Sequence, residues 1–192
     1  DASSRVMLVL GTRGEAVRLM PVLAELRKRP GLLPVVLASG EHRPLLDQAL
    51  AAFGEKPDID LGPMRPGEGL TELLARLLLG IGAAVERHRP ALVLVASDST
   101  TALAGALAAF HARVPVGHVE AGQRSFDLDQ PFPEEANRVT VDNLAELLFA
   151  PNEGAAANLR HEYNRRARIL VTGSPAIDAL HATARRVAGQ PA

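Results

Sequence analysis

The sequence contains no cysteine and no tryptophan, and one tyrosine and five phenylalanines occur among its 192 residues. Without cysteine the chain forms no disulfide, no thiolate metal site and no cysteine nucleophile, which agrees with a cytoplasmic protein. A dominant charge is also absent, because 21 Lys and Arg residues oppose 22 Asp and Glu residues. This balance provides no field for attracting nucleic acid or an anionic membrane. No window approaches the roughly 18 apolar residues of a membrane span, so neither partner is expected.

The sequence does contain enough apolar material for a folded core. Hydrophobic residues make up 47% of the chain and charged residues 22%, proportions typical of a globular protein. A chain of this length suits one domain. The first residues, Asp1 to Arg5, include no initiator methionine and no apolar leader, which indicates a trimmed end and gives no sign of export.

Short apolar runs alternate with longer segments of helical period, which is the sequence pattern of βαβ units around a parallel sheet. The runs are continuously apolar, as in strands that helices cover on both faces. The expected strands are residues 6–10, 35–38, 92–96, 116–119, 147–150 and 169–172, with a short strand near Ile59. The expected helices are residues 15–28, 43–53, 70–89, 99–112, 134–143, 153–161 and 176–187. The pattern therefore predicts an α/β fold, a Rossmann-like parallel sheet with helices on both faces.

No composition shift or internal repeat divides the chain, so one Rossmann-like domain is expected over residues 1–180. Beyond Leu180 the sequence is dominated by Ala, Arg, Gly and Pro without a clear core face. Residues 181–192 are therefore interpreted as a tail or as the start of a connection to a further domain.

The residues after each strand come first in a search for a site, because ligands bind beyond the carboxyl ends of strands in such sheets. Gly11, Thr12, Arg13 and Gly14 follow the first strand. The glycines allow close backbone approach, and the next helix N-terminus favours a phosphate. An ordinary turn with a solvated arginine explains the same residues equally well.

Carboxylates follow two further strands. Asp98 comes directly after residues 92–96, where capping of the next helix is the simpler explanation. Glu120 ends another strand, and a carboxylate there costs desolvation energy unless it is paired or functional. Its structural alternative is an ion pair with Arg124 or His118.

A third acidic position begins the helix at 134–143. Glu134 suits the positive end of the helix dipole, and Arg138 lies one turn later on the same face, which is a complete structural account of both. Convergence favours a function, since acids beside arginines suit an anionic substrate whose reaction moves protons. The predicted cluster consists of Asp98, Glu120, Glu134, Arg13, Arg18 and Arg138.

The histidines give no comparable signal. His42, His118 and His161 do not have the spacing of metal ligands, and each is interpreted as a surface or hydrogen-bonding residue. No metal site is expected.

At these motifs the sequence resembles the non-hydrolysing UDP-N-acetylglucosamine 2-epimerases, from about Val6 to Leu180. The matching stretches are residues 11–13 with 15–16, 42–43 with 46–48, 64–67, 98 with 100–101, 115–122, 131–138, and 172–173 with 177–178. The resemblance implies the first half of a glycosyltransferase-B-like architecture of two Rossmann-like domains, with the active site between them. The second, UDP-binding domain would be absent from this chain.

The resemblance also implies a reaction. The family inverts C2 of the sugar by anti elimination of UDP, which leaves a 2-acetamidoglucal, and by re-addition of UDP to give UDP-N-acetylmannosamine. By motif, Asp98, Glu120 and Glu134 correspond to the family's acid and base groups. Arg13, Arg18 and Arg138 correspond to contacts of the substrate and leaving group. The implied partners are a UDP-sugar substrate, the missing C-terminal domain and a second copy in a homodimer, and no cofactor is implied.

Two departures from the family pattern concern charge. Arg18 stands where the family has a lysine, which keeps the cation and alters its geometry. Glu41 stands where many members have a glutamine, in a region that corresponds to the family's allosteric UDP-N-acetylglucosamine site. A carboxylate there repels a diphosphate, so Glu41, His42 and Arg65 are interpreted as a degenerate form of that site.

Other functions share the same motifs. A hydrolysing relative would release free N-acetylmannosamine by admitting water, and a non-catalytic dimerisation or sugar-nucleotide-binding module would keep the fold without turnover. The expected dimer contact is the helix at 70–89, where Leu79 extends the apolar surface past a single stripe. The isolated chain is expected to fold without turning over substrate, because the reaction needs groups from both sides of a cleft.

Overall fold

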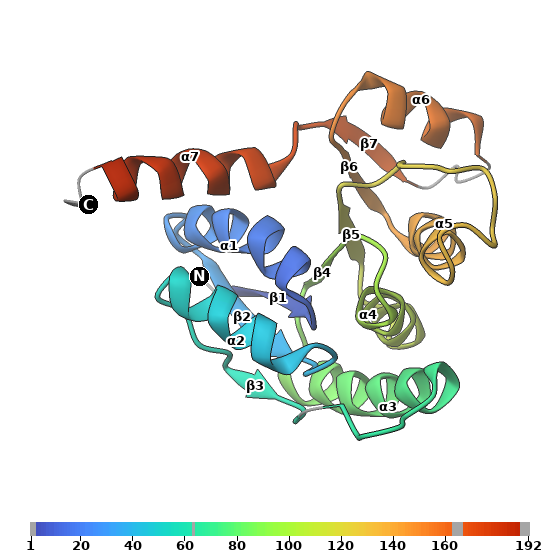
Figure 1. Ribbon diagram of the computed structural model, residues 1–192, viewed down its shortest axis with the longest axis horizontal. Coiled ribbons are helices and arrows are strands. Elements are labelled where there is room, and N and C mark those ends of the chain that lie inside the picture. Colours follow the sequence, from blue (N-terminus) through green and yellow to red (C-terminus); the bar gives the residue numbers. More distant parts are fainter. Residues whose placement is uncertain (1–2, 63, 163–166, 189–192) are drawn as a thin grey trace.

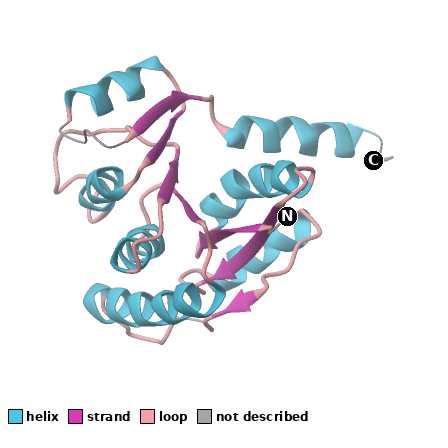
Figure 2. Ribbon diagram, turned by 180° about the vertical axis from the view of Figure 1, so that it is seen from behind, coloured by secondary structure: helices cyan, strands magenta, loops and turns pink. Residues whose placement is uncertain are grey.

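A parallel sheet runs through the middle of the protein, and helices lie on both of its faces (Figures 1 and 2). The structure is a computed structural model that describes residues 3–62, 64–162 and 167–188. Within them the strand order is β3-β2-β1-β4-β5-β6-β7, and every neighbouring pair is parallel. The strands are β1 (Ser4–Leu10), β2 (Leu32–Ala38), β3 (Ile59–Asp60), β4 (Leu92–Ala96), β5 (Val116–Val119), β6 (Leu147–Ala150) and β7 (Arg168–Val171). The predicted fold class is therefore confirmed.

Helices alternate with the strands along the chain. The helices are α1 (Arg13–Arg27), α2 (Arg43–Ala52), α3 (Leu70–His88), α4 (Thr100–His111), α5 (Glu134–Leu144), α6 (Glu153–His161) and α7 (Pro175–Ala188). Helices α1 to α6 each connect one parallel strand to the next, and α7 follows the last strand, β7. Strand order reverses direction between β1 and β4, because the chain first moves from β1 outward to β3 and then returns to the other side of β1. In doubly wound sheets, ligands bind at this kind of reversal.

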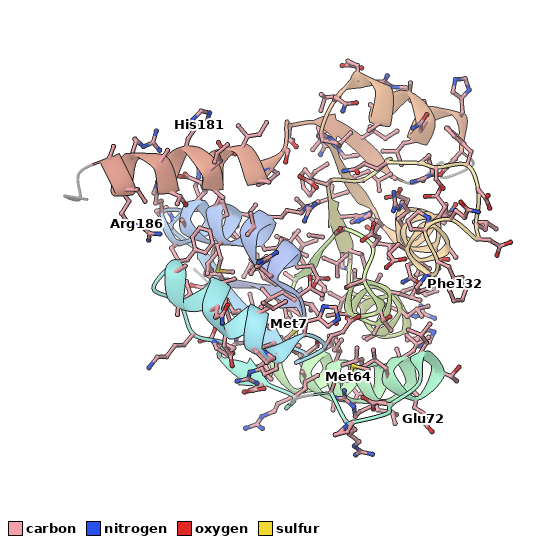
Figure 3. All side chains as sticks on the ribbon, in the orientation of Figure 1. Met7, Met64, Glu72, Phe132, His181 and Arg186 are labelled. Carbon is pink, nitrogen blue, oxygen red and sulfur yellow. The ribbon has the colours of Figure 1, made fainter. Side chains whose placement is uncertain are left out.

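The two faces of the sheet carry separate apolar cores. Successive residues of one strand point to opposite faces, so Met7 packs beneath α3 and α4 whereas Leu8 packs beneath α1 and α2. Both side chains are fully buried. Figure 3 shows Met7 in the interior and Phe132 on the outer surface. This double burial explains why the strands read as continuous apolar runs.

The structure differs from the predicted boundaries of the elements mainly at β2. Strand β2 begins at Leu32, earlier than expected, and contains Pro34. Proline is tolerated because β3 pairs with β2 only at Leu37 and Ala38, which leaves one side of the strand open at Pro34. Helix α7 spans Pro175–Ala188, close to the expected helix at residues 176–187, and it includes Leu180. Residues 189–192 of the expected tail lie outside the described residues.

Candidate functional site

The loops after β1, β4 and β5 lie side by side, because these strands are neighbours in the sheet. Two of the loops begin with a left-handed backbone at a residue that is not glycine: Ser97 has φ 66° and Glu120 has φ 64°. Such conformations cost energy and gather at functional sites. Ser97 directly precedes Asp98, and Glu120 is itself a predicted carboxylate, so backbone strain occurs at the carboxyl edge of both β4 and β5.

Glu120 is nearly buried, and both of its carboxylate oxygens are held. Arg18 of α1 donates its Nε hydrogen to Oε2, and the Ser174 hydroxyl donates to Oε1. Arg18 also donates to the Gly14 carbonyl oxygen at 3.0 Å, which fixes the guanidinium. The alternative pairing of Glu120 with Arg124 or His118 is wrong. The structure instead brings together two residues of the predicted cluster, Arg18 and Glu120.

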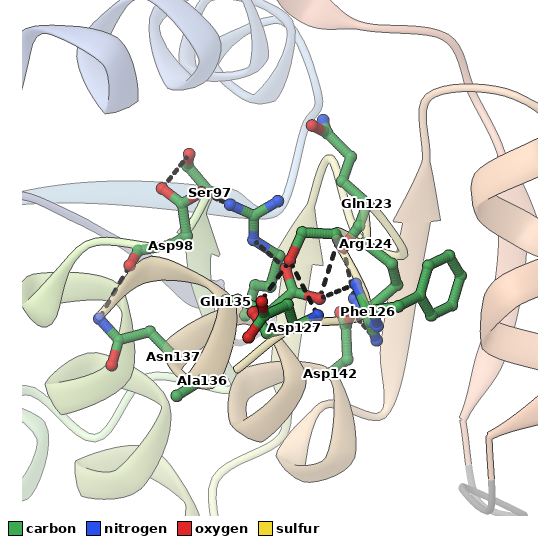
Figure 4. A network of polar contacts seen from close by, with 12 residues as sticks. Ser97, Asp98, Gln123, Arg124, Phe126, Asp127, Glu135, Ala136, Asn137 and Asp142 are labelled. Atoms are coloured by element: carbon green, nitrogen blue, oxygen red, sulfur yellow. Dashed lines mark hydrogen bonds and ion pairs between the residues drawn. The ribbon is translucent and has the colours of Figure 1, made fainter. Parts of the chain in front are cut away.

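Asp98 forms a second carboxylate–arginine pair at the same edge. Its Oδ2 lies 2.7 Å from Arg138 Nη2, and its Oδ1 accepts from the Ser97 hydroxyl at 2.9 Å. Asn137 donates to the Asp98 carbonyl oxygen at 2.9 Å, as Figure 4 shows. The capping explanation for Asp98 is wrong, because the side chain of Ser99 caps α4 by accepting from the amide of Ala102.

The first turn of α5 presents two glutamates in different settings. Glu134 is half-buried and makes no hydrogen bond or ion pair within the described residues. Its convergence with Asp98 and Glu120 stays a prediction. Glu135 is buried, and its Oε1 accepts from the backbone amides of Ser125 and Phe126 at 2.9 and 3.1 Å. Sequence reasoning passed over Glu135, although a carboxylate two residues into a helix is a common partner for a preceding loop.

Glu135 also faces Arg138. Its Oε2 lies 3.3 Å from Arg138 Nε, close enough for an ion pair. The same two atoms are buried without a hydrogen bond, because their alignment does not suit one. We therefore treat this contact as electrostatic attraction alone. Arg138 consequently lies between the carboxylates of Asp98 and Glu135, with a firm contact to Asp98 only.

Glu15 is a buried carboxylate that sequence reasoning also passed over. One oxygen accepts from the amides of Gly11 and Thr12 at 2.7 and 2.8 Å, and the other accepts from the Ser99 hydroxyl. Burial raises the pKa of Glu15 to about 7, against the lowering effect of these hydrogen bonds, and the negative charge of Glu41 raises it further. The spacing of Thr12 and Glu15, a capping box, was the signal available in the sequence.

Arg13 stands apart from these pairs. It begins α1 beside the site, is exposed, and makes no hydrogen bond or ion pair within the described part of the chain. The loop before it approaches α4 closely, because a Cβ on Gly11 would lie 2.2 Å from the side-chain oxygens of Ser39 and Thr101. Only glycine fits at this position. Arg13 is an exposed arginine at the start of α1, and its place at the rim of the site stays a prediction.

The residues interpreted as a degenerate allosteric site follow β2, which lies on the opposite side of β1 from β4 and β5. A hollow of about 430 Å³ is lined by residues 40–45 and Met64. The Glu41 carboxylate is used within the protein: one oxygen accepts from the Thr101 amide at 3.0 Å and from its hydroxyl at 2.6 Å. His42 lines the hollow, whereas Arg65 does not.

Within the described residues, no group of three or more His, Asp or Glu side chains is placed to hold a metal ion. Among the same residues, no helix has the length and apolar character needed to cross a bilayer.

The fold and the site together define a class: a Rossmann-like α/β domain with carboxylate–arginine pairs at the carboxyl edge, where the strand order reverses. The family model described as UDP-N-acetylglucosamine 2-epimerase matches residues 24–192. The chain belongs to this family.

Comparison with individual relatives supports the same family. The chain is 44% identical to the UDP-N-acetylglucosamine 2-epimerase of Yersinia pestis over 97% of its own length and 50% of the relative's. It is 46% identical to that of Escherichia coli K12 over 92% of its length and 47% of the relative's. The crystal structure of the Neisseria meningitidis enzyme bound to UDP-GlcNAc matches with a TM-score of 0.89 and 38% identity, over 97% of this chain and 51% of that one. The chain thus spans about half the length of the curated relatives it matches.

Proposed function

We propose that this chain supplies one half of a UDP-N-acetylglucosamine 2-epimerase and carries its reacting carboxylates. The observation that supports this most is the pairing of Asp98 with Arg138 and of Glu120 with Arg18 at one edge of the sheet. The crystal structure of the Neisseria meningitidis relative contains bound UDP-GlcNAc, and we propose that the present chain binds the same ligand.

In the proposed reaction, a carboxylate removes the proton from C2 of the sugar and the bond from C1 to the diphosphate oxygen breaks. The products of this step are UDP and a 2-acetamidoglucal. When UDP adds back to C1 and a proton is delivered to the opposite face of C2, UDP-N-acetylmannosamine results. Acids on both faces of the ring are required, which is the role proposed for Asp98, Glu120 and Glu134.

Cations are required at the leaving group because charge develops on the diphosphate as the bond breaks. Arg13 is the exposed cation at the rim, so we assign it to the diphosphate. Arg18 and Arg138 orient their partner carboxylates, Glu120 and Asp98, until the substrate arrives.

The test is an epimerisation assay on UDP-GlcNAc with the complete gene product and with residues 1–192 alone. We expect turnover by the former and none by the latter, since half of the cleft is missing. Epimerisation by residues 1–192 at the rate of full-length relatives would contradict the proposal. Identification of the product as UDP-N-acetylmannosamine, rather than free N-acetylmannosamine with UDP, separates epimerisation from hydrolysis.

We further propose that two copies associate through α3 and α4. Leu79 is 76% exposed and Phe110 is 53% exposed, although both are large apolar side chains on neighbouring helices. A hollow of about 430 Å³ between these helices is lined by Leu78, Leu79, Ala108 and other residues. A two-fold contact there would bury the patch on both copies at once.

Sedimentation velocity tests the dimer. We expect Leu79→Glu to convert a dimer to a monomer, because a charge would be buried in the contact. Leu180→Glu is the matched control, since Leu180 is 65% exposed on the distant helix α7. A wild-type protein that sediments as a 20.3 kDa monomer would contradict this part of the proposal. We also place the protein in the cytoplasm, on the absence of cysteine, and cell fractionation checks that location.

A further inference from the structure

A buried histidine and a buried aspartate lie behind the two strained turns of the site. His118 of β5 and Asp142 of α5 are each 1% exposed. Their side chains meet at 2.6 Å, between His118 Nδ1 and Asp142 Oδ1. Neither belongs to the carboxylate–arginine pairs described above, so the reason for placing two ionisable groups in the core has to be found elsewhere.

The hydrogen-bond partners determine the protonation of His118. Its Nε2 lies 2.7 Å from the carbonyl oxygen of Ser97, and a carbonyl only accepts, so Nε2 carries a hydrogen. Asp142 Oδ2 accepts from the Gly122 amide at 3.0 Å and lies 2.7 Å from Arg124 Nη2. Although burial alone would raise the pKa of Asp142, His118 and Arg124 hold it below its usual value. An ionised Asp142 requires a hydrogen on Nδ1 as well.

Arg124 joins this pair to a second carboxylate, Glu162. Arg124 donates through Nε to Glu162 at 2.6 Å in addition to its contact with Asp142. Among the described residues, the ionisable side chains in this cluster are His118, Arg124, Asp142 and Glu162. They come from β5, the 121–133 loop, α5 and the residue that follows α6, and Figure 4 shows Arg124 and Asp142.

We propose that the His118–Asp142 pair is the positioning device of the site. His118 holds the carbonyl of Ser97, whose left-handed backbone precedes Asp98. Asp142 holds the amide of Gly122, which follows the left-handed Glu120. One ion pair thus fixes both turns and sets the spacing of the two carboxylates across the sugar. This role in catalysis rests on the proposed function, whereas the protonation of His118 does not.

The first experiment is nitrogen-15 NMR of labelled histidine rings in the 192-residue chain at neutral pH. We expect both ring nitrogens of His118 to show attached hydrogens. In Asp142→Asn the amide nitrogen can face Nδ1, so the ring should become neutral and keep its hydrogen on Nε2 for Ser97. A wild-type ring with a single hydrogen would overturn the assignment.

The second experiment measures kcat and KM in the complete gene product. His118→Gln releases the Ser97 turn, so we expect kcat to fall by about 100-fold with little change in KM. Asp142→Asn keeps the contact to Ser97 and should lose less. His181→Gln, which changes an exposed histidine on α7, is the control and should keep wild-type values.

A positioning role is overturned if His118→Gln lowers thermal stability yet keeps kcat in the folded fraction. Absence of epimerisation by the wild type would instead reject the proposed function, and the NMR result would still decide the state of His118.

Discussion

Strands β4 and β5 in the middle of the sheet are enclosed on both faces, whereas β7 and α7 at its end are largely exposed. In α7, Ala179 is the buried residue among those described, and Ile177, Leu180 and Val187 are each more than half exposed. Figure 1 shows α7 extending beyond the sheet along α1. The site contacts of this chain lie in the middle of the sheet, and we expect most of its stability to come from the same region. The β7 end contributes one polar contact to the site, from Ser174 to Glu120.

The largest expected effect is on the free energy of unfolding. It is tested by truncating one leucine to alanine in each of two helices, α3 and α7. Leu77 in α3 is fully buried, and Leu180 in α7 is 65% exposed. Leu77→Ala should lower the free energy of unfolding by about 2–5 kcal/mol, through lost burial and a cavity. Leu180→Ala should change it by less than about 0.5 kcal/mol. Urea unfolding measures the stability of both variants. Equal losses of stability would contradict the distinction between the middle of the sheet and its β7 end.

The second prediction concerns the buried carboxylate of Glu15 in α1, which should make the stability of the protein depend on pH. Its folded-state pKa is raised from 4.5 to about 7, so the folded protein holds the proton more tightly than the unfolded chain. The resulting stabilisation, on the order of 3 kcal/mol, is present in full below the unfolded pKa and is lost as pH rises through about 7. Glu15→Gln keeps the acceptor for Gly11 and a donor for Ser99.

We therefore expect wild-type stability, measured relative to Glu15→Gln by urea unfolding, to decrease between pH 5 and pH 8. If the difference between the two proteins stays constant or grows with pH, Glu15 does not titrate as described.

A smaller effect is expected from ion pairs. Arg18 and Glu120 have side chains 28% and 5% exposed, so Arg18→Met leaves a nearly buried carboxylate without its cation. We expect a loss of about 1–3 kcal/mol. Arg160 and Glu153 in α6 are 55% and 75% exposed, and Arg160→Met should change stability by less than about 0.5 kcal/mol. Similar values from urea unfolding of the two variants would show that burial does not govern these pairs.

The fold was predictable because its signals are local. Continuous apolar runs marked β1, β4 and β5, and the three-four spacing of leucines marked α3, which ends with left-handed Arg89 directly before Pro90. The start of β2 was missed since Leu32 and Leu33 become strand only through pairing with Ser4 and Arg5. That pairing depends on strand order, which no single segment contains.

The sequence indicated which carboxylates follow the strands, but it did not indicate which residues they pair with. Strand ends located Asp98 and Glu120, but the partner of Glu120 is Arg18, far away in the sequence. The same limit hid Asp142, which reads as an ordinary polar residue of α5 until the sheet brings His118 beside it. Long-range partners require the order β1-β4-β5, and only the folded chain provides it.

The central proposal is that the carboxylates of Asp98, Glu120 and Glu134 transfer the protons at C2 of a UDP-sugar. The direct measurement is incorporation of deuterium at C2 when the complete gene product acts on UDP-GlcNAc in heavy water. We expect solvent deuterium at C2 of UDP-N-acetylmannosamine, and a decrease of about 100-fold or more in its rate for both Asp98→Asn and Glu120→Gln. Epimerisation without deuterium at C2, or wild-type incorporation by both variants, would contradict the account.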